Sequence, residues 1–201
     1  MKRIPRRLIV VGPAAVLAVI TAALCYELPK SSSFSAASPL SVLRRGDHGG
    51  LGEADGAVPD GATVFDDSVP GVARLDPGLL KALREAATAA ADDGITFYVN
   101  SGRRSAAYQN RLLREAIAKY GSAAEAARWV ATAATSPHVS GDAVDLGHTD
   151  ATNWLSGHGA AYGLCRIYRN EPWHYELRAH AIDHGCPRMY ADPTQDPRMR
   201  Q

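Results

Sequence analysis

The chain has 201 residues, enough for one domain of ordinary size with additional segments, and a formal net charge of +1 at pH 7. The charge is uneven, because residues 1–30 carry five basic side chains and one acidic side chain, whereas the remaining residues carry 17 basic and 20 acidic ones. No stripe of lysine and arginine interleaved with aromatic residues is present, which argues against nucleic acid as a partner.

An uncharged apolar run at residues 8–25 follows a cluster of lysine and arginine. The length of the run is intermediate between that of a long signal-peptide core and that of a short membrane-spanning helix. Because positive flanks stay on the cytoplasmic side, we expect everything after Leu28 to lie outside the cell membrane. No Ala-x-Ala site closes the run, so residues 1–28 are predicted to be an uncleaved single-pass anchor, with secretion after signal cleavage as the alternative. The alternative, that the run is a buried helix of the protein core, would not explain why a cluster of basic residues precedes it.

Residues 29–60 are rich in serine, alanine, glycine and proline and show no sustained apolar period. This composition is typical of a flexible stalk. The sequence therefore predicts an anchor, a stalk over 29–60 and one catalytic domain over 61–201.

In the first half of this domain, the sequence predicts one strand with helices before and after it. A helix is predicted over 77–93, since an Asp-Pro cap signal precedes its apolar period and a glycine ends it. The β-branched and aromatic residues 95–99 predict a strand. A second helix is predicted over 108–120, followed by a shorter alanine-rich helix that ends near residue 131.

The second half predicts a small sheet. A loop beginning at Ser136 is expected to become a strand over 143–146, and residues 149–162 are expected to be helical. Two further strands over 164–168 and 173–177 would form a hairpin. The predicted fold class is α+β, with a small antiparallel sheet that carries a metal site and packs against helices.

Two segments carry the chemistry: SPHVSGDAVD at residues 136–145 and EPWH at residues 171–174. The imidazoles of His138 and His174 and the carboxylate of Asp145 provide three ligands, the number that leaves a tetrahedral zinc ion one open position for water. This mixed nitrogen and oxygen donor set suits zinc better than magnesium or calcium. One catalytic zinc ion is therefore predicted.

A base stands beside the predicted ligands. Glu171 precedes His174 by three residues and is expected to take a proton from bound water, which indicates a hydrolase. Asp142 and His148 are the alternative ligands, because each lies within three residues of Asp145.

The pattern S-x-H-x-x-G-x-A-x-D at residues 136–145, with E-x-x-H at 171–174, resembles the VanY-type zinc D-alanyl-D-alanine carboxypeptidases, a family that includes the related VanX dipeptidases. The resemblance covers roughly 76–192. It extends to SGRRS at 101–105 and to Gln109, which are similar to the family's Ser-Gly-Tyr-Arg-Ser segment.

The resemblance implies a role for each matching residue. By it, Glu171 is the catalytic base and Arg104 is the cation that steadies the substrate carbonyl or its oxyanion. The implied zinc ligands are His138, Asp145 and His174.

Three residues near Arg104 in the sequence each have an alternative interpretation. Arg103 stands where the family usually has tyrosine, and a solvated surface position is the alternative to a place in the site. Ser105 and Gln109 are expected to hydrogen-bond the substrate's peptide or its terminal carboxylate, with polar positions on a helix surface as the alternative.

Two of the three cysteines, Cys165 and Cys186, fall in the part predicted to be exported. An oxidising compartment favours a disulfide between them, which would bracket Glu171 and His174 in its loop. Two buried thiols are the alternative.

The anchor and the resemblance together imply an extracytoplasmic enzyme that removes the last D-alanine from peptidoglycan stem peptides or their precursors. VanX-like dipeptidases act on free D-Ala-D-Ala inside the cell, so the anchor and stalk favour a wall or lipid-linked substrate. A VanX-like dipeptidase and a peptidoglycan endopeptidase of the same fold remain alternatives. A non-catalytic zinc-binding module is disfavoured by Glu171, because a structural zinc would close its fourth position with another protein ligand.

Overall fold

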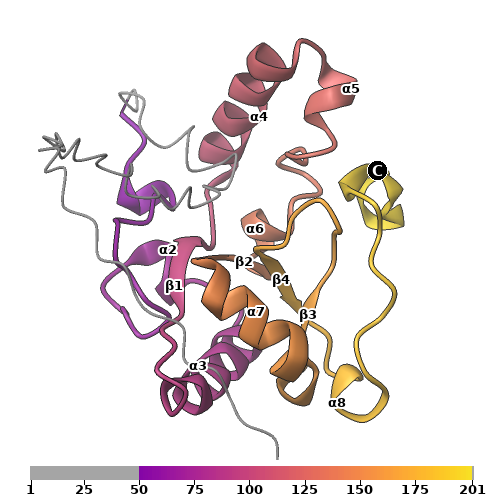
Figure 1. The fold of residues 1–201 in the computed structure, drawn as a ribbon. Helices are drawn as coiled ribbons and strands as arrows, with labels where there is room; N and C mark the ends of the chain where they lie inside the picture. Colours follow the sequence, from indigo (N-terminus) through magenta and orange to yellow (C-terminus); the bar gives the residue numbers. More distant parts are fainter. Residues whose placement is uncertain (1–49, 201) are drawn as a thin grey trace, which may run out of the picture. The chain divides into compact units, whose positions relative to one another are not determined.

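The computed structural model describes residues 50–200, so the predicted anchor (1–28) and most of the predicted stalk (29–60) lie outside the described residues. Four antiparallel strands form one sheet in the order β1-β2-β4-β3, and helices pack on both of its faces (Figure 1). This is the α+β class that the sequence predicts. Within 50–200, none of the helices combines the length and the apolar character that a membrane crossing requires.

The helices, 3₁₀ helices (η) and strands follow one another along the chain as η1 (Glu53–Asp55), α2 (Pro70–Ala73), α3 (Pro77–Ala91), β1 (Tyr98–Ser101), α4 (Ala106–Tyr120), α5 (Ala123–Ala126), α6 (Pro137–Ser140), β2 (Ala143–Gly147), α7 (Thr149–His158), η2 (Gly159–Tyr162), β3 (Leu164–Arg166), β4 (His174–Leu177), α8 (Ala181–His184), η3 (Pro193–Gln195) and η4 (Pro197–Met199).

Strand alternation separates the hydrophobic core from the polar residues of the sheet. On β2, Val144 and Leu146 join the main core cluster with α3 and α7, and on β4 Tyr175 does the same. Because successive side chains of a strand point to opposite faces, the residues between them face away from this core. The register pairs Asp145 with His174, so these two side chains stand next to each other on the second face of the sheet.

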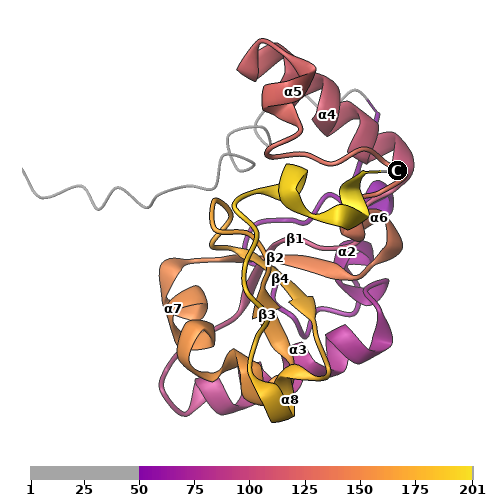
Figure 2. The same cartoon turned by 90° about the vertical axis from the view of Figure 1, so that its right-hand side faces the viewer.

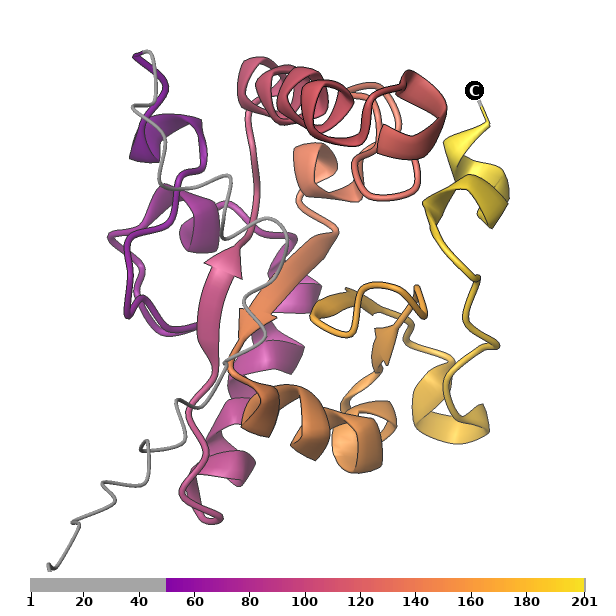
Figure 3. The same ribbon diagram turned by 45° about the horizontal axis from the view of Figure 1, so that its top comes forward.

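The second face is covered by other parts of the chain. Helices α4 and α5 pack against each other in a separate hydrophobic cluster, and α6 precedes β2 (Figure 1). The segment after α8 runs back past β3 and β4 toward the end that holds α4 and α5 (Figures 2 and 3). Asp192 in this segment accepts a hydrogen bond from Arg128, 3.2 Å away. The C-terminal segment therefore belongs to the wall of the polar face.

The described boundaries differ from the predicted ones at several places. The first strand is Tyr98–Ser101 instead of 95–99, because the N–H of Ile95 caps the end of α3 by donating to the Ala90 carbonyl. The segment from Ser136, predicted as a loop, contains the short helix α6. The alanine-rich helix ends at Ala126, before residue 131.

The domain also begins before residue 61. Val58 is buried in the core, and the backbone carbonyl of Asp55 accepts a hydrogen bond from the Ser105 N–H. The predicted stalk therefore extends too far, since its last residues pack against the domain.

Candidate active site

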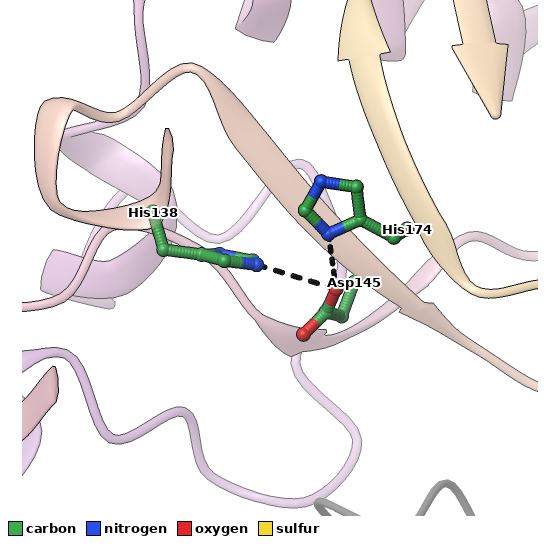
Figure 4. Close-up of side chains that lie close together, drawn as sticks. All are labelled: His138, Asp145 and His174. Carbon is green, nitrogen blue, oxygen red and sulfur yellow. Dashed lines mark hydrogen bonds and ion pairs between the residues drawn. The ribbon is translucent and has the colours of Figure 1, made fainter. Parts of the chain in front are cut away.

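His138, Asp145 and His174 meet on the second face of the sheet (Figure 4). His138 lies on α6, Asp145 in the middle of β2 and His174 at the start of β4. One donor atom from each side chain lies within 4.8 Å of the other two, and all three side chains are buried. Asp145 Oδ1 is 3.4 Å from His138 Nε2 and 3.2 Å from His174 Nδ1. Three donors around one point form a candidate metal site.

Gly141 makes the turn between the first two ligands. It ends α6 with φ of 93°, a left-handed conformation that favours glycine. Its carbonyl accepts a hydrogen bond from the Asp76 N–H, and a Cβ added at Gly141 would stand 3.0 Å from the Arg74 carbonyl oxygen. A side chain here would disturb the path that brings His138 and Asp145 together.

Hydrogen bonds on the far side of each imidazole set which ring nitrogen faces the site. His138 Nδ1 lies 2.9 Å from the Gly102 carbonyl oxygen, which can only accept, so Nδ1 carries the proton and Nε2 is free to bind a metal. His174 Nε2 lies 3.3 Å from Glu176 Oε1, so Nδ1 is the free nitrogen there. The two histidines thus present opposite nitrogens to one point.

Glu176 contacts His174 from outside the two motifs. It is fully buried on β4, two residues after His174, and its carboxylate also binds Arg178 and Arg198. The sequence could have indicated Glu176, because residues i and i+2 of a strand share a face and Glu176 follows His174 by two residues in a predicted strand.

We expect Glu176→Ala to weaken zinc binding about 10- to 100-fold, the usual cost of losing a group that orients a metal-binding histidine. Competition with a chromophoric chelator measures this affinity. Glu176→Gln keeps an acceptor for His174 Nε2 and should recover most of the loss. Equal zinc affinity in the alanine variant and the parent chain would contradict the orienting role.

Glu171 is buried beside the three ligands. Its Oε2 lies 3.7 Å from His174 Nδ1, and its Oε1 has no hydrogen-bond partner among the described residues. Burial, together with nearby Asp145, raises the pKa of Glu171 to about 8 against the lowering influence of His174 and Arg104. A buried carboxylate oxygen without a partner next to three convergent donors fits a metal ion with a bound water.

The ionisable groups that contact His174 are mainly carboxylates. Burial lowers the pKa of His174, but hydrogen bonds to Asp145 and Glu176 and the charge of Glu171 outweigh it and raise the pKa to about 10. Three carboxylates therefore surround this imidazole. A divalent cation would offset that negative charge.

Arg104 is the arginine that reaches the site. It is buried, and its Nη2 donates to Asp145 Oδ2 at 3.0 Å, while its Nη1 donates to Gln109 Oε1 at 3.0 Å. Despite burial, which raises the pKa of Asp145, the neighbouring His138, His174 and Arg104 hold that pKa far below its usual range. Arg104 lies behind Asp145, so the geometry supports a role in holding this carboxylate, and its contact with a substrate oxygen stays a prediction.

The structure changes the expected roles of two neighbours. Gln109 lines the site, but its amide orients Arg104 and donates to the Ala131 carbonyl at 2.8 Å. Ser105 caps α4 by accepting from the Tyr108 N–H, and its hydroxyl donates to Asp55 at 2.9 Å. The Ser105 hydroxyl therefore has a structural role in capping α4, and its contact with a substrate stays a prediction.

We expect Ser105→Ala to cost about 1 kcal/mol of unfolding free energy, as for other N-cap serines, and to leave KM unchanged. Denaturant titration and steady-state kinetics on the same preparation measure the two quantities. A raised KM at unchanged stability would restore the substrate-binding role.

The remaining predicted residues also have defined places. Asp142 and His148, the alternative ligands, are exposed and contribute no donor to the site. Cys165 and Cys186 form a disulfide, which joins β3 to the segment after α8 and encloses Glu171 and His174 in its loop.

The site surrounds a small cavity of about 20 Å³, lined by the three ligands, Glu171 and parts of the C-terminal segment that include Met199. A cavity needs about 10–15 Å³ to hold one water molecule. The cavity therefore has room for roughly one water in this conformation.

Comparisons with known proteins agree with the geometry. The family model described as VanY, D-alanyl-D-alanine carboxypeptidase, matches residues 72–180. A D-alanyl-D-alanine carboxypeptidase of Enterococcus faecalis (strain ATCC 700802 / V583) is 32% identical, with 51% of this chain and 47% of the relative aligned. The chain thus spans about half the length of that curated relative.

Solved structures show the same fold. A mutant of the vancomycin resistance D,D-pentapeptidase VanY from a VanB-type cassette, in complex with Zn(II), matches with a TM-score of 0.51 and 28% identity over 55% of this chain and 75% of that chain. VanYB in complex with D-alanine-D-alanine matches with a TM-score of 0.51 and 28% identity, covering 55% and 74% of the two chains. The LdcB LD-carboxypeptidase shares the fold at 21% identity and a TM-score of 0.51, over 67% of this chain and 73% of that chain. With the family model matching more than half of its residues, the chain belongs to the VanY D-alanyl-D-alanine carboxypeptidase family.

Proposed function

We propose that this chain is a zinc D,D-carboxypeptidase that hydrolyses the terminal D-Ala-D-Ala bond of peptidoglycan stem peptides or their precursors. The observation that carries the proposal is the buried His138, Asp145 and His174 donor set with the unpartnered Glu171 oxygen beside it. Family membership and the relatives solved with Zn(II) and with D-alanine-D-alanine support it.

The free donor atoms would hold the ion: His138 Nε2, His174 Nδ1 and Asp145 Oδ1. When bound, zinc lowers the pKa of water toward neutrality and polarises a carbonyl oxygen. Gly102 and Glu176 keep the two imidazoles in the required tautomers, and Arg104 keeps Asp145 ionised. The protein's part is therefore a buried set of ligands whose orientation is fixed by these hydrogen bonds.

Glu171 handles the proton. Its Oε1 accepts a proton from the attacking water as the new C–O bond forms, and then returns it to the amine as the C–N bond breaks. The products are a shortened peptide and free D-alanine.

We propose further that residues 1–28 anchor the enzyme in the cell membrane and that the catalytic domain lies outside. The basic cluster before an apolar run supports this orientation. The Cys165–Cys186 disulfide supports it as well, because such bonds persist mainly in oxidising compartments.

The substrate pattern tests the proposed activity. Amine release is measured with a pentapeptide that ends in D-Ala-D-Ala, with the same peptide ending in L-Ala, and with free D-Ala-D-Ala, each with and without a zinc chelator. Chelator-sensitive release of one D-alanine from the D-Ala-D-Ala pentapeptide alone is the expected result. Preference for the free dipeptide would assign the chain to the VanX-like dipeptidases, and no release by the zinc-loaded chain would favour an endopeptidase or a binding module.

A further inference from the structure

A second and larger cavity lies apart from the metal site. Its volume is about 490 Å³, within the range of about 300–1,000 Å³ typical of small-molecule sites, and it shares no lining residue with the cavity around Glu171. Four arginines line it: Arg166, Arg178, Arg188 and Arg198. We call it the arginine cavity.

Buried carboxylates hold two of these arginines in place. Arg198 binds Glu176 and Asp196, and Arg178 binds Glu176 at 2.6 Å. Glu176 is fully buried, and Asp196 is itself fixed by the Tyr168 hydroxyl. Two guanidinium groups are therefore set in the wall before any ligand arrives.

The other two arginines have no acidic partner among residues 50–200. Arg166 donates through Nε to the weak acceptor Met189 Sδ, and Arg188 makes no hydrogen bond or ion pair within the described part of the chain. The cavity thus has four cationic side chains against the two carboxylates of Glu176 and Asp196. This excess of positive charge favours an anion.

The backbone brings the two unpaired arginines to the same cavity. Arg166 is the last residue of β3, and the Cys165–Cys186 disulfide ties the neighbouring position to the segment that carries Arg188. A hydrogen bond from the Tyr190 N–H to the Ile167 carbonyl, at 2.9 Å, holds the same segment further along. The placement is therefore built into the fold.

The chemistry of the wall indicates the ligand class. Guanidinium groups match the oxygens of phosphate through paired N–H donors. The wall also contains the ring of Tyr190, which is 36% exposed, and two prolines, which offer apolar surface to the remainder of a ligand. We propose that the arginine cavity binds a phosphate group, carried either as the diphosphate of a small molecule or as the phosphodiesters of a polymer.

Binding of two probes to the full chain tests the proposal: UDP-N-acetylglucosamine as the small-molecule diphosphate and a short glycerol phosphate polymer as the phosphodiester. Titration calorimetry at low salt should show saturable binding of at least one probe, and the preferred probe distinguishes the two sources. Arg166→Gln and Arg188→Gln should each weaken that binding about tenfold, because each removes a charged donor from the phosphate. Arg114→Gln, at an exposed position on α4 that does not line the cavity, should leave the affinity for the probe unchanged.

Phosphate can also bind zinc, so the titration is repeated after zinc removal. Binding that persists in the metal-free chain and responds to Arg166 and Arg188 would support the arginine cavity. Absence of saturable binding by both probes, loss of binding with the metal, or an equal effect of Arg114→Gln would each overturn the proposal. These results do not depend on peptidase activity, so they can fail while the proposed function stands.

Discussion

Glu171→Gln should lower kcat for release of D-alanine by about 10²- to 10⁴-fold, the usual contribution of a general base, without loss of bound zinc. Glutamine has nearly the shape of glutamate but cannot accept a proton at neutral pH. Glu171 is not one of the three convergent donors, so the metal site keeps its ligands. Release of D-alanine from the pentapeptide gives kcat, and metal analysis of the same sample gives the zinc content.

Glu85→Gln is the matched control for this substitution. Glu85 is exposed on α3 and forms only a surface ion pair with Lys81, a kind of pair that contributes little to stability. Its replacement should leave kcat unchanged. Full activity of Glu171→Gln would mean that another group accepts the proton, and loss of zinc in that variant would mean that Glu171 is a ligand.

His138→Ala should weaken zinc affinity by more than the roughly 100-fold cost of an outer positioning residue, because it removes one of the three protein ligands. His138 Nδ1 is committed to the Gly102 carbonyl, so Nε2 is its only nitrogen free for the metal. Activity should fall with zinc occupancy and should recover in part at raised zinc concentration. Chelator competition measures the affinity.

His148→Asn is the control for this second change. His148 lies three residues after Asp145, and the sequence offers it as an alternative ligand. It is exposed, and its ring packs against the ring of Tyr98. Zinc affinity should be unchanged in this variant. A loss equal to that of His138→Ala would show that the ligand set has been wrongly assigned.

The fold class and the metal site followed from local signals. The apolar period and the Asp-Pro cap predicted α3, and the strand patterns placed Asp145 and His174 on neighbouring strands, as the register between them shows. The ligands could be predicted because each belongs to a short segment of fixed spacing. The Cys165–Cys186 bridge followed in the same way from cysteine count and expected export.

Contacts between distant segments could not be predicted in this way. Arg198 binds Glu176 from 22 residues further along the chain, and Ser105 caps α4 while binding Asp55 from 50 residues earlier. No local period encodes such pairs, because they depend on how the C-terminal and N-terminal segments fold back over the sheet. For the same reason the domain begins earlier than composition suggested, since a stretch rich in glycine and alanine still packs when the core accepts a residue such as Val58.

Anomalous diffraction at the zinc absorption edge, from crystals of the zinc-loaded protein, tests whether His138, Asp145 and His174 bind the metal. The expected result is one peak at about 2.0–2.2 Å from His138 Nε2, His174 Nδ1 and Asp145 Oδ1, with Glu171 outside the ligand set. A peak ligated by Glu171, Asp142 or His148, or no peak between the three predicted donors, would contradict the proposed site.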